Sequence, residues 1–214
     1  MRIEWLGHAC FLLEVENLKI ITDPYEPGSY GGAVGYSDIN VDADIVTVSH
    51  NHFDHNYIKP FSKAEIIDRE GSFKVKGIEI EGLKSFHDES GGSQRGENII
   101  FIFNIKGLKL AHLGDLGHIP KDLERLKNLD AVLIPVGGTF TINANSATKL
   151  IDLIKPRIVI PMHFKTEKLG FDIEGVDKFI EGKNNVEDLG ASFVEIERES
   201  LPSLSKIIIL RPSR

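Results

Sequence analysis

The most informative segment of the chain, from Ile45 to Tyr57, reads IVTVSHNHFDHNY. Its first four residues form a short apolar run rich in β-branched side chains, which is typical of a buried strand. Three histidines and one aspartate follow within six residues: His50, His52, Asp54 and His55. Imidazole nitrogens and carboxylate oxygens are ligands that zinc and similar divalent ions take. The stretch therefore predicts a buried strand that carries four metal ligands at its end.

The spacing of these four residues suits two ions better than one. In an extended chain, residues two apart point the same way, so His50 and His52 can bind the same ion. Asp54 and His55 lie past a turn, and the chain advances about 3.3 Å per residue. We therefore expect them to face a second ion a few ångströms from the first.

Two ions need more than four ligands, and three further residues are placed to supply them. His87 follows the run LKSF, Asp115 lies in HLGDLGH after the run LKLA, and His163 follows IVIPM. Each stands at the exit of an apolar run, which is where open sheets place their sites. A carboxylate at Asp115 could bridge two ions. On spacing alone, His112 is as plausible a ligand as His87.

The rest of the chain reads as layered sheets covered by helices. Short apolar runs bounded by Gly, Asp, Asn or Pro recur from end to end, as in buried strands. Helical periodicity predicts helices over 120–129 and 145–154, capped by Asn145 or Ser146, and near 176–180. Strands dominate the first half and alternate with helices in the second, which indicates layered α/β architecture. The glycine-rich stretches 27–35 and 89–96 predict surface loops.

Composition narrows the classes of function. The chain has 214 residues, 41% hydrophobic and 27% charged, which suits one globular domain over residues 1–214. Its net charge of −7 disfavours nucleic acid as a partner. No apolar stretch is long enough for a membrane helix and the N-terminus does not read as a signal peptide, so we expect a cytoplasmic protein without membrane contact. The single cysteine, Cys10, sits in an apolar strand pattern and is expected in the core.

These residues carry a resemblance to a known family. HNHFDH at 50–55 resembles the HxHxDH signature of the metallo-β-lactamase superfamily, and the order His87, Asp115, His163 matches its later ligands. IEWLGHACFLLE at 3–14 and PVGGTFTINANSA at 135–147 resemble the small metal-dependent hydrolases related to ascorbate-phosphate lactonase. The resemblance extends from about Ile3 to Phe164.

The resemblance implies a four-layer αβ/βα sandwich, α/β in class, with a dinuclear site at one edge. It favours His87 over His112 as a ligand. It assigns the first ion to His50, His52 and His87, the second to Asp54, His55 and His163, and the bridging position to Asp115.

Four other residues have possible roles near such a site. His8 in the first strand is either a neighbour of the ligands or a hydrogen-bonded core histidine. His118 is either a proton donor or anion contact, which would make it catalytic beside Asp54, or a surface turn residue. Asp23 in TDP resembles a family aspartate that supports the site, although an Asx-Pro turn also explains it. Arg95 either meets an anionic substrate or is a solvated loop residue.

Such a site predicts hydrolysis. A cation lowers the pKa of its bound water from about 15.7 toward about 7, which gives a nucleophile at neutral pH. Two divalent ions change the net charge from −7 to −7 + 4 = −3, so the cleft can be positive in an acidic protein. We expect a small-molecule substrate, an anionic ester, lactone or phosphodiester. Zinc is the expected ion, with manganese, iron and nickel as alternatives.

Other members of the superfamily fit less well. A di-iron oxidoreductase would be expected to carry glutamate at position 52 and a flavin domain. An RNA-processing nuclease would be expected to carry an inserted domain and basic surfaces. An exported β-lactamase would need a leader. The alternative from another class is a metal-binding sensor or scaffold with little turnover. A homo-oligomer stays open, and the loop residues Tyr30, Val34 and Tyr36 are candidates for its interface.

Overall fold

A computed structural model describes all residues, 1–214, and contains two β-sheets. The first sheet has six strands in the spatial order β13-β1-β2-β3-β4-β5. In chain order these are β1 (Arg2–Gly7), β2 (Cys10–Val15), β3 (Leu18–Thr22), β4 (Ile45–Thr47), β5 (Glu65–Ile67) and β13 (Phe193–Glu195). The predicted strand at the start of the metal-ligand stretch is β4.

The second sheet has eight strands in the order β12-β14-β11-β10-β9-β8-β7-β6. In chain order these are β6 (Gly71–Val75), β7 (Ile78–Phe86), β8 (Glu97–Ile105), β9 (Leu108–His112), β10 (Ala131–Pro135), β11 (Ile158–Met162), β12 (Val186–Asp188) and β14 (Lys206–Ile209). β9, β10, β11 and β14 pair in parallel. Every residue of β10 and β11 is buried, which explains their continuous apolar sequences.

Two tight turns shape the antiparallel half of this sheet. Lys76 and Gly77 join β6 to β7, and Lys106 and Gly107 join β8 to β9, with positive φ at all four residues. Two consecutive positive φ angles define the turn whose twist matches that of paired strands. Glycine at the second position makes this conformation accessible.

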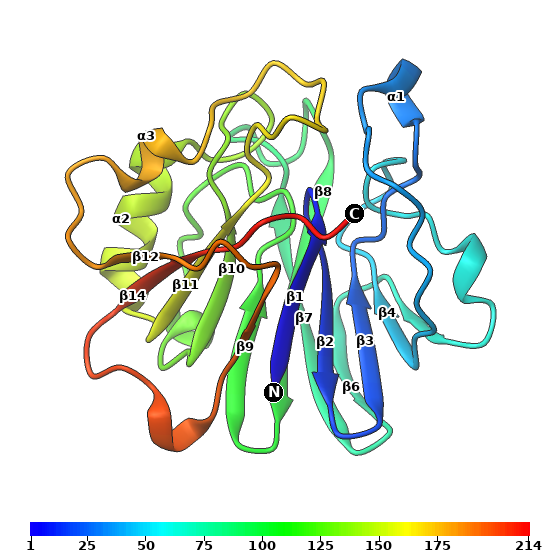
Figure 1. The fold of residues 1–214 in the computed structure, drawn as a ribbon, viewed down its shortest axis with the longest axis horizontal. Helices are drawn as coiled ribbons and strands as arrows, with labels where there is room; N and C mark the ends of the chain where they lie inside the picture. Colours follow the sequence, from blue (N-terminus) through cyan, green and yellow to red (C-terminus); the bar gives the residue numbers. More distant parts are fainter.

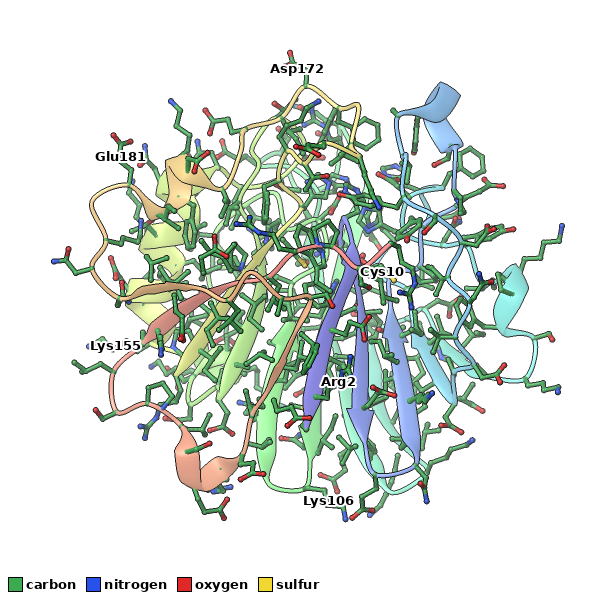
Figure 2. The ribbon with its side chains drawn as sticks, viewed as in Figure 1. Arg2, Cys10, Lys106, Lys155, Asp172 and Glu181 are labelled. Carbon is green, nitrogen blue, oxygen red and sulfur yellow. The ribbon has the colours of Figure 1, made fainter.

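The core lies between the two sheets and continues on the outer side of the first one. A cluster of 43 buried residues includes Phe11 and Leu13 of β2 together with side chains of the second sheet. Alternate residues of the same strand, Cys10 and Leu12, belong to a second cluster of 13 residues. Because both faces of the first part of β2 are covered, residues 10–13 are apolar without alternation. Cys10 is fully buried, as expected, and Figure 2 shows it inside the layered body.

Two of the three predicted helices form, those near 145–154 and 176–180, and the two-sheet α/β architecture is confirmed. The helices of the structure are α1 (Ser29–Gly32), α2 (Ala144–Ile154) and α3 (Asp177–Ile180), and Figure 1 shows α2 and α3 beside the second sheet. The predicted helix over 120–129 is wrong. Only a 3-10 turn at Glu124–Leu126 forms there, and Leu126 and Leu129 are buried from irregular backbone.

The helix α2 confirms the second helix prediction but corrects its cap. The side chain of Asn143, not Asn145 or Ser146, accepts a hydrogen bond from the backbone N of Ser146 at 3.0 Å. Its buried residues recur at helical spacing, and the helix ends at Lys155 in a left-handed conformation before Pro156.

Two surface expectations also change. Val34 and Tyr36 were candidates for an interface between copies, but both are buried in the second cluster, and only Tyr30 of the three is exposed. None of the three helices has the length and apolar content needed to cross a bilayer.

Candidate metal centre

Six strands of the two sheets deliver polar residues to one edge of the molecule. β1 and β3 run in the same direction because each pairs antiparallel with β2, and β4 is parallel to β3. β7, β9 and β11 share one direction in the second sheet by the same reasoning. The loops after the strands gather at one end of the two layers in Figure 1, where Asp172 is labelled in Figure 2. The residues that follow these strand ends are His8, Asp23, the segment 49–57, His87, Asp115 and His163.

Asp115 is the centre of the group. Its Oδ2 lies 3.1 Å from Nε2 of His87, 3.2 Å from Nε2 of His55 and 3.3 Å from Nε2 of His163. Nε2 of His50 lies 3.8 Å away. The carboxylate itself is only 2% exposed. Four imidazoles from both sheets therefore converge on one buried oxygen.

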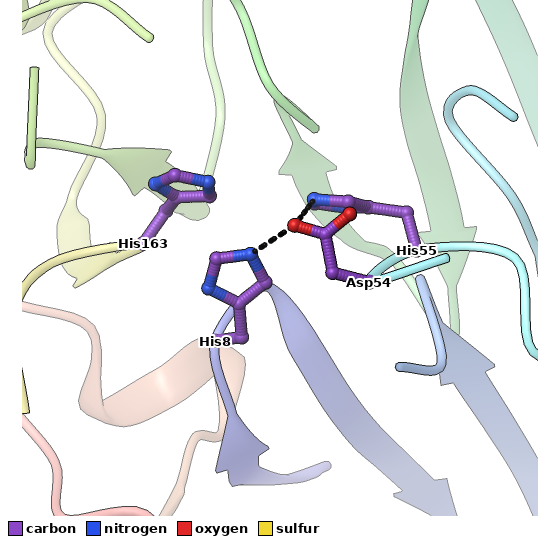
Figure 3. Close-up of side chains that lie close together, drawn as sticks. All are labelled: His8, Asp54, His55 and His163. Atoms are coloured by element: carbon purple, nitrogen blue, oxygen red, sulfur yellow. Dashed lines mark hydrogen bonds and ion pairs between the residues drawn. The ribbon is translucent and has the colours of Figure 1, made fainter. Parts of the chain in front are cut away.

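The possible ligand atoms divide into two main groups with Asp115 between them. The first contains His50, His52 and His87, whose ligand atoms lie within 4.8 Å of one another. The second meets the same limit and contains His8, Asp54, His55 and His163, which face one another in Figure 3. Six of the seven predicted ligands fall into these two groups, and Asp115 contacts both.

A buried hydrogen-bond network orients two of the imidazoles. Oδ2 of Asp23 lies 2.9 Å from Nδ1 of His55 and accepts a hydrogen bond from Oγ of Ser49 at 2.5 Å, while Oδ1 accepts one from the backbone N of Ser49 at 2.7 Å. Oγ of Ser49 lies 2.9 Å from Nδ1 of His50. Because Oγ of Ser49 donates its only hydrogen to Asp23, it can take part in the contact with His50 only as an acceptor, so Nδ1 of His50 must donate. The network thus places a proton on Nδ1 of both rings and leaves each Nε2 lone pair for a ligand.

Burial and charge set the protonation of the centre. Burial lowers the pKa of His50 well below its usual range, and the neighbouring His55 adds to the effect. Burial alone would raise the pKa of Asp115, but His163 and His55 hold it well below its usual range. Burial would lower the pKa of His55, but Asp115 and Asp54 raise it well above its usual range. The carboxylates are therefore ionised, and their negative charge attracts either a proton or a metal cation.

The donor set fits metal ions because it is unsatisfied by the protein alone. Ten buried side-chain nitrogen and oxygen atoms have no hydrogen-bond partner. A buried polar atom left without a partner costs about 1–3 kcal/mol, so such atoms are rare unless a ligand completes them. Seven of the ten belong to residues of this cluster: Nδ1 of His8, Nε2 of His50, Oδ1 of Asp54, Nε2 of His55, Nδ1 of His87, Oδ1 of Asp115 and Nδ1 of His163. Two of them, Nε2 of His50 and Nε2 of His55, are also among the imidazole atoms that converge on Asp115.

His87 and His112 differ in the partners of their ring nitrogens. His87 lies in the cluster, whereas Nε2 of His112 is 2.8 Å from the backbone O of Ala9 and its Nδ1 accepts a hydrogen bond from the backbone N of Gly114 at 3.1 Å. Both ring nitrogens of His112 are thus used inside the protein. His112 is therefore a buried histidine whose hydrogen bonds are made within the fold.

Of the two remaining histidines, His8 contacts the cluster and His118 does not. Nε2 of His8 lies 3.0 Å from Oδ2 of Asp54, and its ring packs 4.1 Å from that of His163, so His8 belongs to the centre. His118 does not. Its Nε2 accepts a hydrogen bond from the backbone N of Phe86 at 3.3 Å, and it lines neither of the pockets that contain His87. The expectation that His118 meets the substrate is therefore not supported by its position.

Three residues that hold the site in place were not predicted from the sequence. Ser49 links Asp23 to His50, as described above. Asn98 in β8 accepts a hydrogen bond from the backbone N of Asp115 at 2.9 Å and donates to the backbone O of Leu113 at 3.0 Å. Asp88 accepts hydrogen bonds from the backbone N atoms of four residues of the loop 89–96. Ser49 and Asp88 each had one signal in the sequence, their places beside His50 and His87. Asn98 had none, because its partners belong to the distant backbone of Leu113 and Asp115.

A pocket of about 400 Å³ opens over the centre. Asp54, His87, Asp115 and His163 line it, together with Arg95 and aromatic side chains. A larger cavity of about 710 Å³ is lined by residues 164–168 and the C-terminal segment and contains none of the clustered ligands. The smaller pocket is therefore the one placed for chemistry.

The chain is similar to known proteins along most of its length. A family model described as beta-lactamase superfamily domain matches residues 2–163, which includes every predicted ligand. A UPF0173 metal-dependent hydrolase of Methanosarcina mazei is 32% identical, covering 86% of this chain and 92% of that protein. Another from Methanosarcina barkeri is 33% identical with the same coverage. A solved structure from Thermotoga maritima, assigned to the metallo-β-lactamase superfamily, is 36% identical with a TM-score of 0.78, covering 98% of this chain and 97% of that one.

Proposed function

The chain belongs to the metal-dependent hydrolases of the beta-lactamase superfamily, and from this premise we propose that it uses two metal ions to hydrolyse a small anionic ester, lactone or phosphodiester. The observation that carries the proposal is the convergence of four imidazole Nε2 atoms within 3.1–3.8 Å of one buried Asp115 oxygen. Without cations, such a gathering of ionised and unpartnered groups would be costly to bury.

We assign the ligands by the two groups and the atom between them. Each imidazole is a neutral nitrogen ligand and each carboxylate an anionic one, a donor set that suits zinc and also accepts manganese, iron or nickel. We propose His50, His52 and His87 for the first ion, Asp54, His55 and His163 for the second, and Asp115 as the bridge.

The ions, when bound, would supply a water nucleophile at neutral pH and stabilise the negative charge that develops on the substrate. The residues of the chain hold this arrangement in place. Asp23 and Ser49 fix the tautomers of His50 and His55, and the contact of His8 with Oδ2 of Asp54 at 3.0 Å restrains that carboxylate. Asp54 is thus placed to act as both ligand and proton acceptor at the pocket floor.

The size and the opening of the pocket suit an enzyme that acts on a small substrate. A volume of about 400 Å³ is near the lower end of the range for small-molecule sites. Two carboxylates and two divalent ions would give the floor a net charge of −2 + 4 = +2, which attracts an anion. The opening of the pocket next to Asp115 gives a substrate access to the ions, which favours an enzyme over a closed metal sensor.

The proposal is tested by metal analysis and a substrate screen. Purified protein loaded with zinc, manganese, iron or nickel is expected to retain about two ions per chain and to hydrolyse at least one generic phosphodiester, lactone or carboxylic ester. The His163→Ala variant is expected to retain about one ion and to lose activity, whereas His112→Asn should retain both ions. Failure to retain metal after loading, or equal metal content in wild type and His163→Ala, would overturn the proposal.

A further inference from the structure

Four aromatic side chains from four separate segments lie close together at the pocket over Asp115, and three of them line it. Tyr30 lies in α1, Phe53 in the loop after β4, Phe140 in the loop after β10 and Phe171 in the loop after β11. The centroid of the Tyr30 ring is 5.5 Å from that of Phe171 and 6.2 Å from that of Phe53, and the Phe140 and Phe171 centroids are 5.8 Å apart. All three pairs are edge to face, an arrangement that aromatic rings prefer. We call these four residues the aromatic rim.

The aromatic rim is unusual for its exposure. Phe53 is 62% exposed and Tyr30 is 48% exposed, and they are two of only six large hydrophobic side chains exposed on the protein. Tyr30, Phe140 and Phe171 line the pocket itself, above Asp54 and Asp115. Apolar side chains that gather at a concave site, instead of in the core, indicate a ligand-binding surface.

The backbone at Tyr30 is held in a conformation that an aromatic residue rarely adopts. Its φ is 52° and its ψ is 44°, in the left-handed region, and Gly28, Gly31 and Gly32 around it also have positive φ. A bulky residue in this region is unfavourable, and such residues concentrate at functional sites. The glycines make the turn possible, and the turn keeps the Tyr30 ring against Phe171 over the pocket.

Arg95 is the only basic side chain other than histidine that lines the pocket. Its guanidinium carbon lies 5.6 Å from the centroid of the Phe140 ring, and it makes no ion pair with a carboxylate of the protein. Its backbone N donates to Oδ2 of Asp88 at 2.8 Å, which fixes the loop that carries it. A guanidinium packed on a ring and lacking an anionic partner is suited to bind a carboxylate or phosphate oxygen.

From these contacts we propose that the pocket selects a substrate with a flat apolar ring and a negatively charged group. The ring packs against Tyr30, Phe140 and Phe171, the negative charge pairs with Arg95, and the bond to be cleaved lies toward Asp115 at the floor. The inference rests on the proposed hydrolysis and deepens it by naming the class of substrate.

The test measures binding, so that it does not depend on turnover. Metal-loaded protein is titrated calorimetrically with phenylphosphonate, methylphosphonate and benzyl alcohol, which carry ring and charge, charge alone and ring alone. We expect phenylphosphonate to bind about ten-fold more tightly than methylphosphonate, because stacking and ring burial add to charge pairing. Benzyl alcohol should bind more weakly than phenylphosphonate by at least about ten-fold.

Variants separate the two halves of the site. Phe140→Leu and Phe171→Leu keep an apolar side chain but remove the ring, so each should weaken phenylphosphonate binding and leave methylphosphonate binding unchanged. Arg95→Gln should weaken both phosphonates by a similar factor. The matched control is Phe193→Leu, which removes a half-exposed ring that also lies beneath an arginine, Arg2, but on β13 and away from the pocket. It should change neither affinity.

The outcomes distinguish this inference from the proposed hydrolysis. Equal affinities for phenylphosphonate and methylphosphonate in wild type, or unchanged binding in all three pocket variants, would overturn the inference even if hydrolysis were observed. Ring-dependent and charge-dependent binding in a protein that hydrolyses nothing would support the ligand class and count against the proposed reaction.

Discussion

Replacing Asp23 by asparagine should weaken metal binding although Asp23 itself is not one of the proposed ligands. Three donors point at its carboxylate: Nδ1 of His55 at 2.9 Å, the backbone N of Ser49 at 2.7 Å and Oγ of Ser49 at 2.5 Å. Asparagine has the same shape but offers only one acceptor oxygen and places an NH2 group at the other position. If the amide oxygen keeps the backbone N of Ser49, the NH2 group faces His55.

Two N–H groups cannot face each other, so the proton of His55 would move to Nε2. That atom lies 3.2 Å from Oδ2 of Asp115 and is the proposed ligand atom, which the proton would block. Loss of a supporting carboxylate behind a histidine ligand costs about ten- to hundred-fold in metal affinity, which is about 1.4–2.7 kcal/mol. The unsatisfied buried groups should also lower the free energy of unfolding by about 1–3 kcal/mol.

The assay is competition for Mn²⁺ or Zn²⁺ against a chelator of known affinity, with metal content measured after dialysis. The matched control is Asp44→Asn. Asp44 also accepts a backbone hydrogen bond, from Lys19 at 2.9 Å, but it precedes β4 and so lies at the opposite end of that strand from the metal centre. We expect wild-type metal affinity in Asp44→Asn. Wild-type affinity in a folded Asp23→Asn protein would refute the reasoning about tautomers.

Four further outcomes are expected. His8→Asn keeps a residue that tolerates the positive φ of 54°, but its shorter side chain should lose the contact with Asp54. The variant should lower kcat and second-ion affinity while first-ion affinity stays unchanged; equal losses at both ions would contradict the role of His8. Gly114→Ala should destabilise the fold and reduce metal content. The new Cβ would lie 2.3 Å from Oδ1 of Asn98, and the φ of +55° at position 114 is unfavourable for alanine. A wild-type melting temperature would argue against this. Removing metal with a chelator should lower the melting temperature, and adding it back should restore the temperature in a concentration-dependent way. The hydrogen bond from Lys76 holds the pKa of Asp44 below its usual range, so its stabilisation is present above the unfolded pKa of about 3.9 and is lost as pH falls below it. The difference in unfolding free energy between wild type and Asp44→Asn should therefore be at most about 1 kcal/mol at pH 7 and should shrink as the pH falls below about 3.9, as urea titrations at neutral and acidic pH would show.

Much of the candidate site could be predicted because its residue types are rare in combination. His50, His52, Asp54 and His55 are close in the sequence, so their ligand chemistry is visible without a fold. The strands could be predicted for a similar reason, since runs such as those of β10 and β11 are apolar throughout. The helix expected over 120–129 failed because Leu126 and Leu129 face the core from irregular backbone, and leucine spacing alone does not distinguish that from a helix.

Residue type and local order are enough to identify the side chains that can bind metal and to place them after buried strands. The packing of the sheets is needed to see that His87 and not His112 joins the cluster, that His8 contacts Asp54 and that His118 lies outside. It also brought together four aromatic residues from separate segments, three of which line one pocket. The physical reason is that these are contacts between distant segments, set by how two sheets pack and in which direction their strands run, and no local pattern records them.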